Sequence, residues 1–213
     1  MKEARELLRR RRQQRERPQT DTKILAAWNG MAIRAFVDAA VYLEEPRWLE
    51  EARKTADFAC TRLVAADGSL RRSYTQDEAR LPGFLDDYAF LIDGLLALAD
   101  ASGEQKWLDF AKQLQAKQDT LFWDERNGGY FFVSDEHAQL LGRTKIWFDN
   151  VTPSGNAMAA SNLLRLSRVT GDGAYKKRAE KLLAAGSYWL DQAPAAVPAL
   201  AAAAAACYLH DEP

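Results

Sequence analysis

The feature that most constrains the fold is a repeat of about sixty residues. In each copy two helical patterns are joined by a short polar turn, and an aromatic residue lies 20 positions after the start of the first pattern, at Trp48, Trp107 and Tyr175. The aromatic anchors recur after 59 and 68 residues. Because a single helical hairpin cannot bury its apolar face alone, consecutive hairpins must stack. The repeat therefore predicts an all-α domain of tandem helical hairpins.

The two helices of each predicted hairpin differ in charge. Residues 31–43, 89–99 and 157–169 carry apolar side chains at i, i+3 and i+4 with few charges, whereas the helices that follow have a strongly charged face. We therefore expect the first helix of each pair to lie inside and the second to lie outside. An inner and an outer layer of helices are typical of an (α/α)6 toroid, of which these hairpins would form a part.

Charge is balanced overall and uneven along the chain. The net charge is -1, whereas residues 1–17 alone carry +5 and the remainder -6. A basic run can bind nucleic acid or anionic lipid, but no aromatic residue interleaves these arginines as a nucleic-acid stacking surface requires. We interpret residues 1–20 as a solvated basic helix that belongs to a preceding hairpin, and we predict no nucleic-acid and no membrane partner.

The chain shows no targeting or redox signal. Cys60 and Cys207 are the only cysteines and form no CxxC pair, which argues against a dithiol centre and a cysteine-based zinc site. No apolar segment follows the charged start, and the apolar run 198–209 is too short to cross a bilayer. We expect a cytoplasmic protein.

Two long connectors separate the predicted hairpins. Residues 64–86 and 121–153 contain glycine, proline, aspartate and aromatic residues, and long loops in compact domains often carry function. In the second connector, Asn127-Gly128-Gly129 is followed by aromatic and β-branched residues. This pattern predicts a small β-hairpin over residues 122–133.

Polar and aromatic residues gather at the predicted starts of the inner helices. If these helices are parallel neighbours in a ring, their amino-terminal ends meet at one mouth, together with the connectors. Aromatic rings with amides and carboxylates suit a polyhydroxylated ligand such as a sugar. Asp86 and Asp87 are the candidate catalytic acids. The candidate substrate-binding residues are Asp21, Lys23, Trp28, Asn29, Tyr88, Trp123, Asp124, Asp149, Ser154 and Asn156.

Simple capping is the competing explanation for several of these residues. Asn29, Asp86, Asp87 and Ser154 are all of the types that cap helix amino termini, and Trp28 can equally be a core residue. Adjacent residues on a helix point in different directions, so Asp86 and Asp87 are not expected to act together as an acid–base pair. A partner acid would come from Asp21, Asp124 or Asp149.

Several chemistries are disfavoured by what the chain lacks. Its two histidines, His137 and His210, do not lie on predicted inner helices, which argues against a histidine-based epimerase or metal centre. The sequence contains no phosphate-binding loop, no GxSxG motif and no dinucleotide fingerprint. We predict no metal ion and no cofactor.

Four motifs in order resemble one known family. They are Asp21 to Gly30 (DTKILAAWNG), Gly83 to Phe90 (GFLDDYAF), Phe122 to Asp124 with Gly128 to Phe132, and Pro153 to Asn156 (PSGN). The stretch from Ala4 to about Ala185 resembles the C-terminal helical domain of the spermatogenesis-associated, thioredoxin-domain family. The resemblance implies a six-hairpin toroid similar to N-acylglucosamine 2-epimerases and several glycosidases. It implies pocket roles for Asp21, Lys23, Trp28, Asn29, Asp86, Asp87, Tyr88, Ser154 and Asn156.

The chain departs from that family pattern in three ways. The family has two consecutive acids before the lysine, whereas Thr22 stands in the second position here. The chain contains no thioredoxin-like segment and accounts for about three and a half hairpins where the toroid has six. We expect one partial toroid domain over residues 1–213. It would associate with itself, with a missing half-toroid or with a thioredoxin domain, because an open half-ring exposes apolar faces.

Three hypotheses for function remain at this point. The first is an enzyme that hydrolyses or isomerises a sugar or glycan, with Asp86 or Asp87 as acid or base. The second is a non-catalytic ligand-binding or scaffold module that serves a thioredoxin-domain partner. The third is an inactive fragment. Fold analogy favours the first only weakly, because one fold carries many functions.

Overall fold

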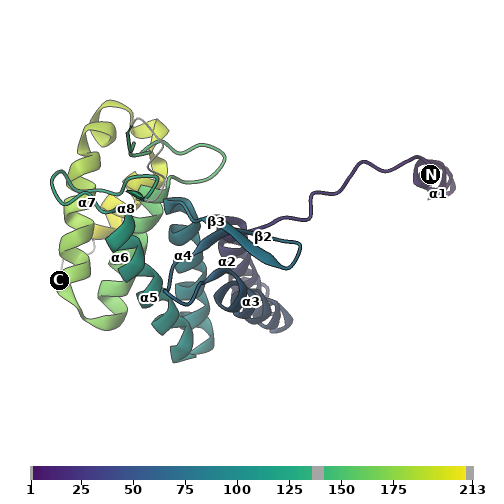
Figure 1. Ribbon diagram of the computed structural model, residues 1–213, viewed down its shortest axis with the longest axis horizontal. Coiled ribbons are helices and arrows are strands. Elements are labelled where there is room, and N and C mark those ends of the chain that lie inside the picture. The colour runs from purple at the N-terminus through teal and green to yellow at the C-terminus, as the bar shows by residue number, and fades with distance from the viewer. Residues whose placement is uncertain (1, 136–141, 210–213) are drawn as a thin grey trace.

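The computed structural model describes residues 2–135 and 142–209, and its main body is a stack of helical hairpins (Figure 1). The first helices of the hairpins are α2 (Ala26–Tyr42), α4 (Leu85–Ser102) and α6 (Gly155–Thr170). The second helices are α3 (Arg47–Phe58), continued by the π-helical turn η1 (Ala59–Leu63), α5 (Gln105–Phe122) and α7 (Gly173–Gln192). A 3₁₀ turn η3 (Pro194–Ala196) leads into α8 (Pro198–Tyr208).

The helices form two layers, as the repeat predicts. Each first helix packs against its own second helix and also against the first helix of the next hairpin, so α2, α4, α6 and α8 form a continuous inner row. In α4, which lies between α2 and α6, every residue from Asp87 to Leu98 is buried. The prediction of tandem hairpins that form part of a toroid is confirmed.

The aromatic anchors of the repeat hold the outer helices in place. Trp48 at the start of α3 stacks on Phe36 of α2, with ring centroids 5.7 Å apart. Trp107 at the start of α5 is fully buried, and Tyr175 of α7 packs against the core. The constant spacing in the sequence therefore reflects a constant packing contact between the two helices of each hairpin.

Local signals in the sequence define the helix ends. Ser154 accepts a hydrogen bond from the Ala157 N–H at the start of α6, and Asp172 accepts one from the Ala174 N–H at the start of α7. Gly103 and Gly171 follow α4 and α6 with φ of 69° and 72°, a conformation that glycine adopts without strain.

The β-hairpin lies in a different connector from the one predicted. Strands β2 (Arg71–Thr75) and β3 (Glu78–Pro82) pair antiparallel, and β1 (Ile24–Leu25) adds to the other edge of β2. Residues 122–133 instead form a turn closed by a single bridge between Trp123 and Tyr130. The reason is that Asp124 accepts hydrogen bonds from the Arg126 and Asn127 N–H groups, which curls the chain before a strand ladder can start.

The basic segment stands apart from the hairpins. Helix α1 (Lys2–Gln13) is exposed along its whole length, and an exposed stretch leads from it to β1 (Figure 1). The helix predicted over residues 1–20 therefore ends at Gln13. Within the described residues, no helix combines the length and apolar character needed to cross a membrane. His137 and His210 lie outside the described residues.

Candidate functional site: the mouth of the inner helices

The amino-terminal ends of the inner helices are tied together by aspartates. Asp87 of α4 accepts a hydrogen bond of 3.2 Å from the Ala27 N–H at the start of α2. Asp149 accepts bonds of 2.7 Å from the N–H groups of Ser154, which caps α6, and Ala199 in α8. Asp86 interacts with the Gly155 N–H at the start of α6. The predicted convergence of helix ends at one mouth is therefore present in the structure.

Asp87 is fully engaged in holding this arrangement. The residue is 1% exposed, and its side chain accepts hydrogen bonds from the N–H groups of Phe84 and Ala27 and from the guanidinium of Arg72 on β2. Burial raises the pKa of Asp87, and these three partners act in the opposite direction. A carboxylate with both oxygens occupied in this way is a structural anchor for α2, α4 and β2.

Asp86 differs from its neighbour because it is only partly buried. Burial and the adjacent charge of Asp87 raise the pKa of Asp86 to about 6, against the opposing effects of Arg72 and the Gly155 N–H. Its carboxylate lies so close to Gly155 that a Cβ at that position would collide with Oδ1. A partly buried carboxyl group with a pKa near neutrality can donate or accept a proton at physiological pH.

Tyr88, Ser154 and Asn156 have structural contacts that account for their positions. Tyr88 is buried, and its hydroxyl accepts a 2.7 Å hydrogen bond from the Leu70 N–H. Asn156 is fully buried and clamps the second connector onto α6, because its amide bonds to the N–H and carbonyl of Tyr130 and to the carbonyl of Ile146. These residues support the mouth from within the core.

Trp123 and Asp124 belong to the turn that this clamp holds. Trp123 is 9% exposed and packs edge-on against Tyr130. Asp124 pairs with Lys145 at 2.7 Å, and hydrogen bonds from Lys145 and Asn127 hold the pKa of Asp124 far below its usual range. Asp124 is thus ionised at neutral pH, and both of its carboxylate oxygens accept hydrogen bonds.

Trp28 and Asn29 lie at a separate hollow on the open edge of the helical stack. An open hollow of about 400 Å³ is lined by both residues together with Lys23, Lys54 and Phe58, among others, and Asp86 is not part of its lining. Trp28 is 66% exposed, and Asn29 donates a hydrogen bond to the Leu25 carbonyl. Asp21 accepts a hydrogen bond from the Lys23 N–H and forms an exposed ion pair with the Lys23 side chain, and both contacts lower the pKa of Asp21.

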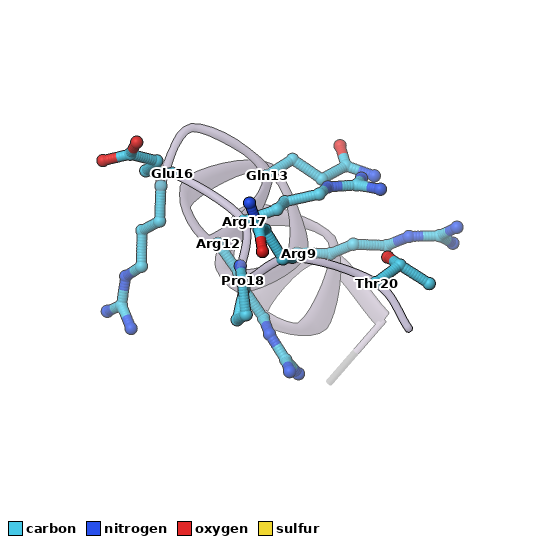
Figure 2. Close-up of a pocket in the computed structure, with 9 residues that line it drawn as sticks. Arg9, Arg12, Gln13, Glu16, Arg17, Pro18 and Thr20 are labelled. Carbon is cyan, nitrogen blue, oxygen red and sulfur yellow. The ribbon is translucent and has the colours of Figure 1, made fainter. Parts of the chain in front are cut away.

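A larger hollow of about 600 Å³ lies beside α1 and has none of the features of a binding site. Residues 15–20 turn back along the helix, and the side chains around the space point away from one another into solvent (Figure 2). Every lining residue is exposed, including Arg9, Arg12 and Arg17. Among the described residues, no group of three or more His, Cys, Asp or Glu side chains is placed to hold a metal ion.

Sequence reasoning missed Arg72 and Gly155 as parts of the site. Arg72 bonds to Asp87 at 3.3 Å, and its guanidinium lies 4.6 Å from the ring centroid of Phe84. It comes from a strand that the sequence did not predict, so no local signal revealed it. Gly155 had a signal, since a glycine at the first position of a buried helix indicates a close approach by another group.

The sequence has curated relatives in animals. It is 38% identical over 205 residues to human spermatogenesis-associated protein 20. The aligned region covers 92% of this chain and 26% of the human protein. The chain is a homologue of spermatogenesis-associated protein 20. An uncharacterized protein of Caenorhabditis elegans is 33% identical over 94% of this chain and 28% of its own length. The chain thus spans about a quarter of the length of these curated relatives, and no family model matches it.

Several solved structures that superpose on this chain are named as enzymes that act on sugars. A GH76 α-mannanase of Bacteroides thetaiotaomicron superposes with a TM-score of 0.73 at 14% identity, covering 91% of this chain and 54% of the enzyme. Cellobiose 2-epimerase of Spirochaeta thermophila superposes with a TM-score of 0.64 at 19% identity. The superposition covers 77% of this chain and 43% of the epimerase. An inactive α-1,6-mannanase variant of Salegentibacter, bound to α-1,6-mannotriose, superposes with a TM-score of 0.61 at 13% identity. The superposition covers 76% of this chain and 46% of the mannanase. These similarities show the (α/α)6 toroid fold alone.

Proposed function

We propose that this chain forms part of a carbohydrate-active site in which Asp86 is the acid–base residue. The observation that carries the proposal is the difference between the candidate acids in hydrogen bonding, exposure and pKa. Both oxygens of Asp87, Asp124 and Asp149 accept hydrogen bonds, and Asp21 is paired with Lys23. Asp86 alone combines partial exposure with a pKa of about 6.

The structural neighbours support a sugar as the ligand. They include an epimerase and mannanases, whose substrates are rich in hydroxyl groups. The inactive mannanase variant has asparagine in place of two consecutive aspartates. Asp86 and Asp87 are also consecutive and lie at the mouth of the inner helices, where helix N–H groups favour a developing negative charge.

The division of labour between the two aspartates follows from their contacts. Asp87 fixes the relative positions of α2, α4 and β2, and its charge is one reason that the pKa of Asp86 is raised. Asp86 then exchanges the proton with the substrate. General acid–base catalysis by one positioned carboxyl group contributes about 10²- to 10⁴-fold to a rate. The structure fits both a hydrolase and an isomerase, and the products will distinguish them.

The test is a turnover screen against glycosides, free sugars and amino sugars, with products identified by NMR. We expect at least one sugar to be converted, and Asp86→Asn to lower kcat by about 100-fold or more. Asp109→Asn, the same replacement at an exposed position on α5, serves as the matched control and should keep full activity.

Two outcomes would overturn the proposal. One is an Asp86→Asn variant that converts the sugar as fast as the unmodified protein. The other is the absence of both binding and conversion across the panel. Sugar binding without conversion would instead favour the alternative function, a non-catalytic ligand-binding module of a larger protein.

A further inference from the structure

The motif at residues 21–30 is not accounted for by the proposed acid, although it holds several of the candidate site residues. Three of them lie together at the open hollow of about 400 Å³ beside the start of α2, and α3 forms the opposite side. The polar and aromatic side chains of the lining are Lys23, Trp28, Asn29, Lys54, Thr55 and Phe58. We call this space the Trp28 hollow.

Contacts of the fold hold the lining of the Trp28 hollow in place. Strand β1 pairs with β2 and so fixes the position of Lys23, which precedes it. Phe58 of α3 packs edge-on against Tyr74 of β2, with ring centroids 5.3 Å apart. Asn29 donates a 2.8 Å hydrogen bond to the Leu25 carbonyl, which fixes the orientation of its amide. The hollow is therefore a formed feature of the α2–α3 hairpin.

Trp28 offers a flat apolar surface at this hollow. The residue is 66% exposed and lies in the first turn of α2. The aliphatic face of a pyranose ring can pack on such an aromatic ring. Beside it, Oδ1 of Asn29 accepts no hydrogen bond from the described residues, and the Thr55 hydroxyl, which donates to the Glu51 carbonyl, keeps its acceptor capacity. These acceptors suit sugar hydroxyl groups.

The charged groups of the lining are both lysines. Lys23 pairs with Asp21 at 3.2 Å and Lys54 pairs with Glu51 at 2.8 Å. Neither acid belongs to the lining, and among the described residues no carboxylate lines this hollow. An ammonium group has three N–H donors, so each lysine can bind its acid and a ligand together. The hollow therefore favours a ligand with a negative charge.

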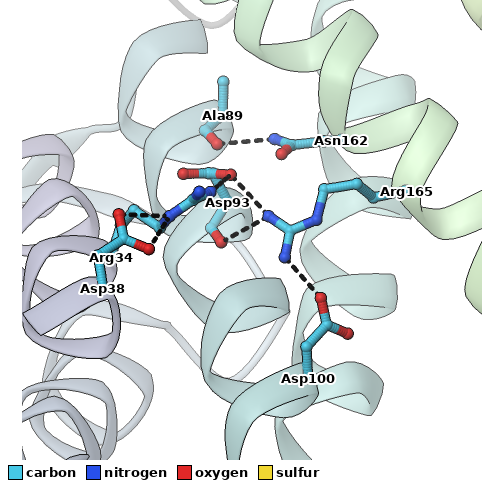
Figure 3. A network of polar contacts seen from close by, with 7 residues as sticks. All are labelled: Arg34, Asp38, Ala89, Asp93, Asp100, Asn162 and Arg165. Atoms are coloured by element: carbon cyan, nitrogen blue, oxygen red, sulfur yellow. Dashed lines mark hydrogen bonds and ion pairs between the residues drawn. The ribbon is translucent and has the colours of Figure 1, made fainter. Parts of the chain in front are cut away.

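A second hollow, further along α2, has the opposite character. It measures about 270 Å³ and adjoins a charged network that ties α2, α4 and α6 together (Figure 3). Asp93 of α4 accepts hydrogen bonds from Arg34 of α2 at 3.2 Å and from Arg165 of α6 at 2.8 Å. Arg34 also pairs with Asp38, and Arg165 with Asp100. Charges of both signs line that hollow, so it gives an anion no advantage.

We infer that the Trp28 hollow binds an acidic sugar, a pyranose ring that carries a carboxylate group. The ring packs on Trp28, its hydroxyl groups meet Asn29 and Thr55, and the carboxylate binds the ammonium groups of Lys23 and Lys54. This site goes beyond the proposed function, because Asp86 is not part of its lining and the bound sugar need not be converted.

NMR titration of the full chain locates the ligand. The indole N–H signal of Trp28 is the one that disappears in Trp28→Phe. We expect glucuronate and galacturonate to shift this signal and to bind at least about three-fold more tightly than glucose and galactose, since exposed charge contacts add modestly to affinity. The advantage should shrink as the salt concentration rises. Acetate, which has the charge without the ring, should bind far more weakly than either uronate.

Two variants separate the ring contact from the charge contact. Trp28→Ala should lower the affinity for glucuronate about ten-fold or more, because the platform is lost. Lys54→Gln should lower it about three-fold and leave the affinity for glucose nearly unchanged. The matched controls are Tyr42→Ala, an 81% exposed aromatic residue on α2 outside the hollow, and Lys112→Gln, an exposed lysine on α5. Both should bind glucuronate as the unmodified protein does.

Three results would each disprove an acidic-sugar site at this hollow. They are an unchanged Trp28 signal at saturating uronate concentrations, equal affinities for uronates and neutral sugars, and acetate binding as tight as that of glucuronate. Unfolding midpoints of all variants show whether a loss of binding reflects a loss of fold. Asp86→Asn should leave uronate binding here intact, so failure of this site and failure of the proposed function are told apart.

Discussion

At the scale of single residues, Asp86 and Asp87 show how neighbours in the sequence acquire different roles. Both sit in the first turn of α4, where either could cap the helix. The 100° rotation between adjacent helical positions sends Asp87 towards α2 and Asp86 towards α6. Asp87 meets a backbone N–H and an arginine and becomes buried, whereas Asp86 meets Gly155 and stays accessible.

The raised pKa of Asp86 predicts a stability that falls as the pH rises. Its folded pKa of about 6 lies above the ordinary value of 3.8, so the folded state holds the proton more tightly than the unfolded state between these pH values. Stability linked to Asp86 is present below pH 4 and is lost as the pH passes 6. Asp86→Asn should therefore raise the free energy of unfolding at pH 7.5 by up to about 3 kcal/mol.

Urea denaturation of both proteins at pH 4 and pH 7.5 checks this prediction. At pH 4 the two should be nearly equally stable, because Asp86 is then protonated. A variant that is less stable than the unmodified protein at pH 7.5 would show that the carboxylate is stabilising and that its pKa is not raised.

Asn156 gives a second prediction at this scale. Asn156→Ala removes three hydrogen bonds and leaves the buried N–H of Tyr130 without a partner, so we expect a loss of roughly 2–4 kcal/mol of unfolding free energy. Thermal unfolding measures the loss. Asn127→Ala, which removes a bond in the exposed part of the same turn, should cost much less, and equal losses would contradict the clamp role.

At the scale of elements, the contact between α2 and α4 depends on two glycines. A Cβ on Gly30 would collide with the backbone at Phe90, and one on Gly94 would lie 2.5 Å from the Gly30 carbonyl oxygen. The two helices therefore approach each other with backbone against backbone. This close approach brings Ala27 within hydrogen-bonding distance of Asp87 at the mouth.

Alanine at these positions should separate the helices. We expect Gly30→Ala to lower the free energy of unfolding by about 3 kcal/mol, because the obstacle is backbone that cannot turn aside. Gly173→Ala at the start of α7, where a Cβ meets nothing within 4 Å, should be neutral or slightly stabilising. Chemical denaturation gives both values, and a harmless Gly30→Ala would disprove the close contact.

The helices of this fold were predictable from sequence and the hairpin was not. The repeat of aromatic anchors and the apolar spacing are local features that survive in the structure as contacts of Trp48 and Trp107. The turn between β2 and β3 instead uses Gln76 and Asp77 with φ of 51° and 60°, positions where glycine or asparagine is the usual signal. Residues 127–129 have the more conventional turn sequence, but Asp124 binds the N–H groups of Arg126 and Asn127, and the chain there forms a tight turn instead of a hairpin.

The same limit applies to the candidate site. The motifs place Asp86, Asp87, Ser154 and Asn156 near the mouth, which the structure confirms as a location. They do not tell which carboxylate is buried and which stays partly exposed, because that depends on Arg72 and on backbone groups far away in sequence. Arg34, Asp93 and Arg165 escaped notice since they sit mid-helix, where charged residues are usually read as solvated.

At the scale of the whole molecule, the stack has an open edge along α2. Trp28, Tyr42 and Leu43 are 66%, 81% and 64% exposed, and Trp28 and Tyr42 lie about four helical turns apart on one side of the helix. Such an apolar edge favours association.

We expect the purified chain to self-associate with rising concentration in sedimentation velocity experiments. Tyr42→Glu should weaken the association about ten-fold or more, because it places a charge on the apolar edge. Tyr188→Glu, at a similarly exposed tyrosine on α7, is the control. A chain that remains monomeric at every concentration would contradict this expectation.

Helix α1 contributes little to the stability of the hairpins, since it has no buried residue. Removing residues 2–20 should change the unfolding midpoint by less than about 2 °C. Limited trypsin digestion should also cleave first among Arg9 to Arg17. A large drop in the midpoint would mean that α1 packs against the hairpins in solution.

The bare backbone at Gly155 has a consequence for how this mouth can evolve. The oxygen of Asp86 occupies the place that a methyl group at position 155 would take. The missing Cβ lets the carboxylate of Asp86 come close to Gly155, whose N–H lowers the pKa of Asp86 against the effect of burial. A homologue with a side chain at this position would need either a different orientation of Asp86 or a wider gap between α4 and α6. The pKa of the acid and the spacing of these two helices therefore have to change together in evolution.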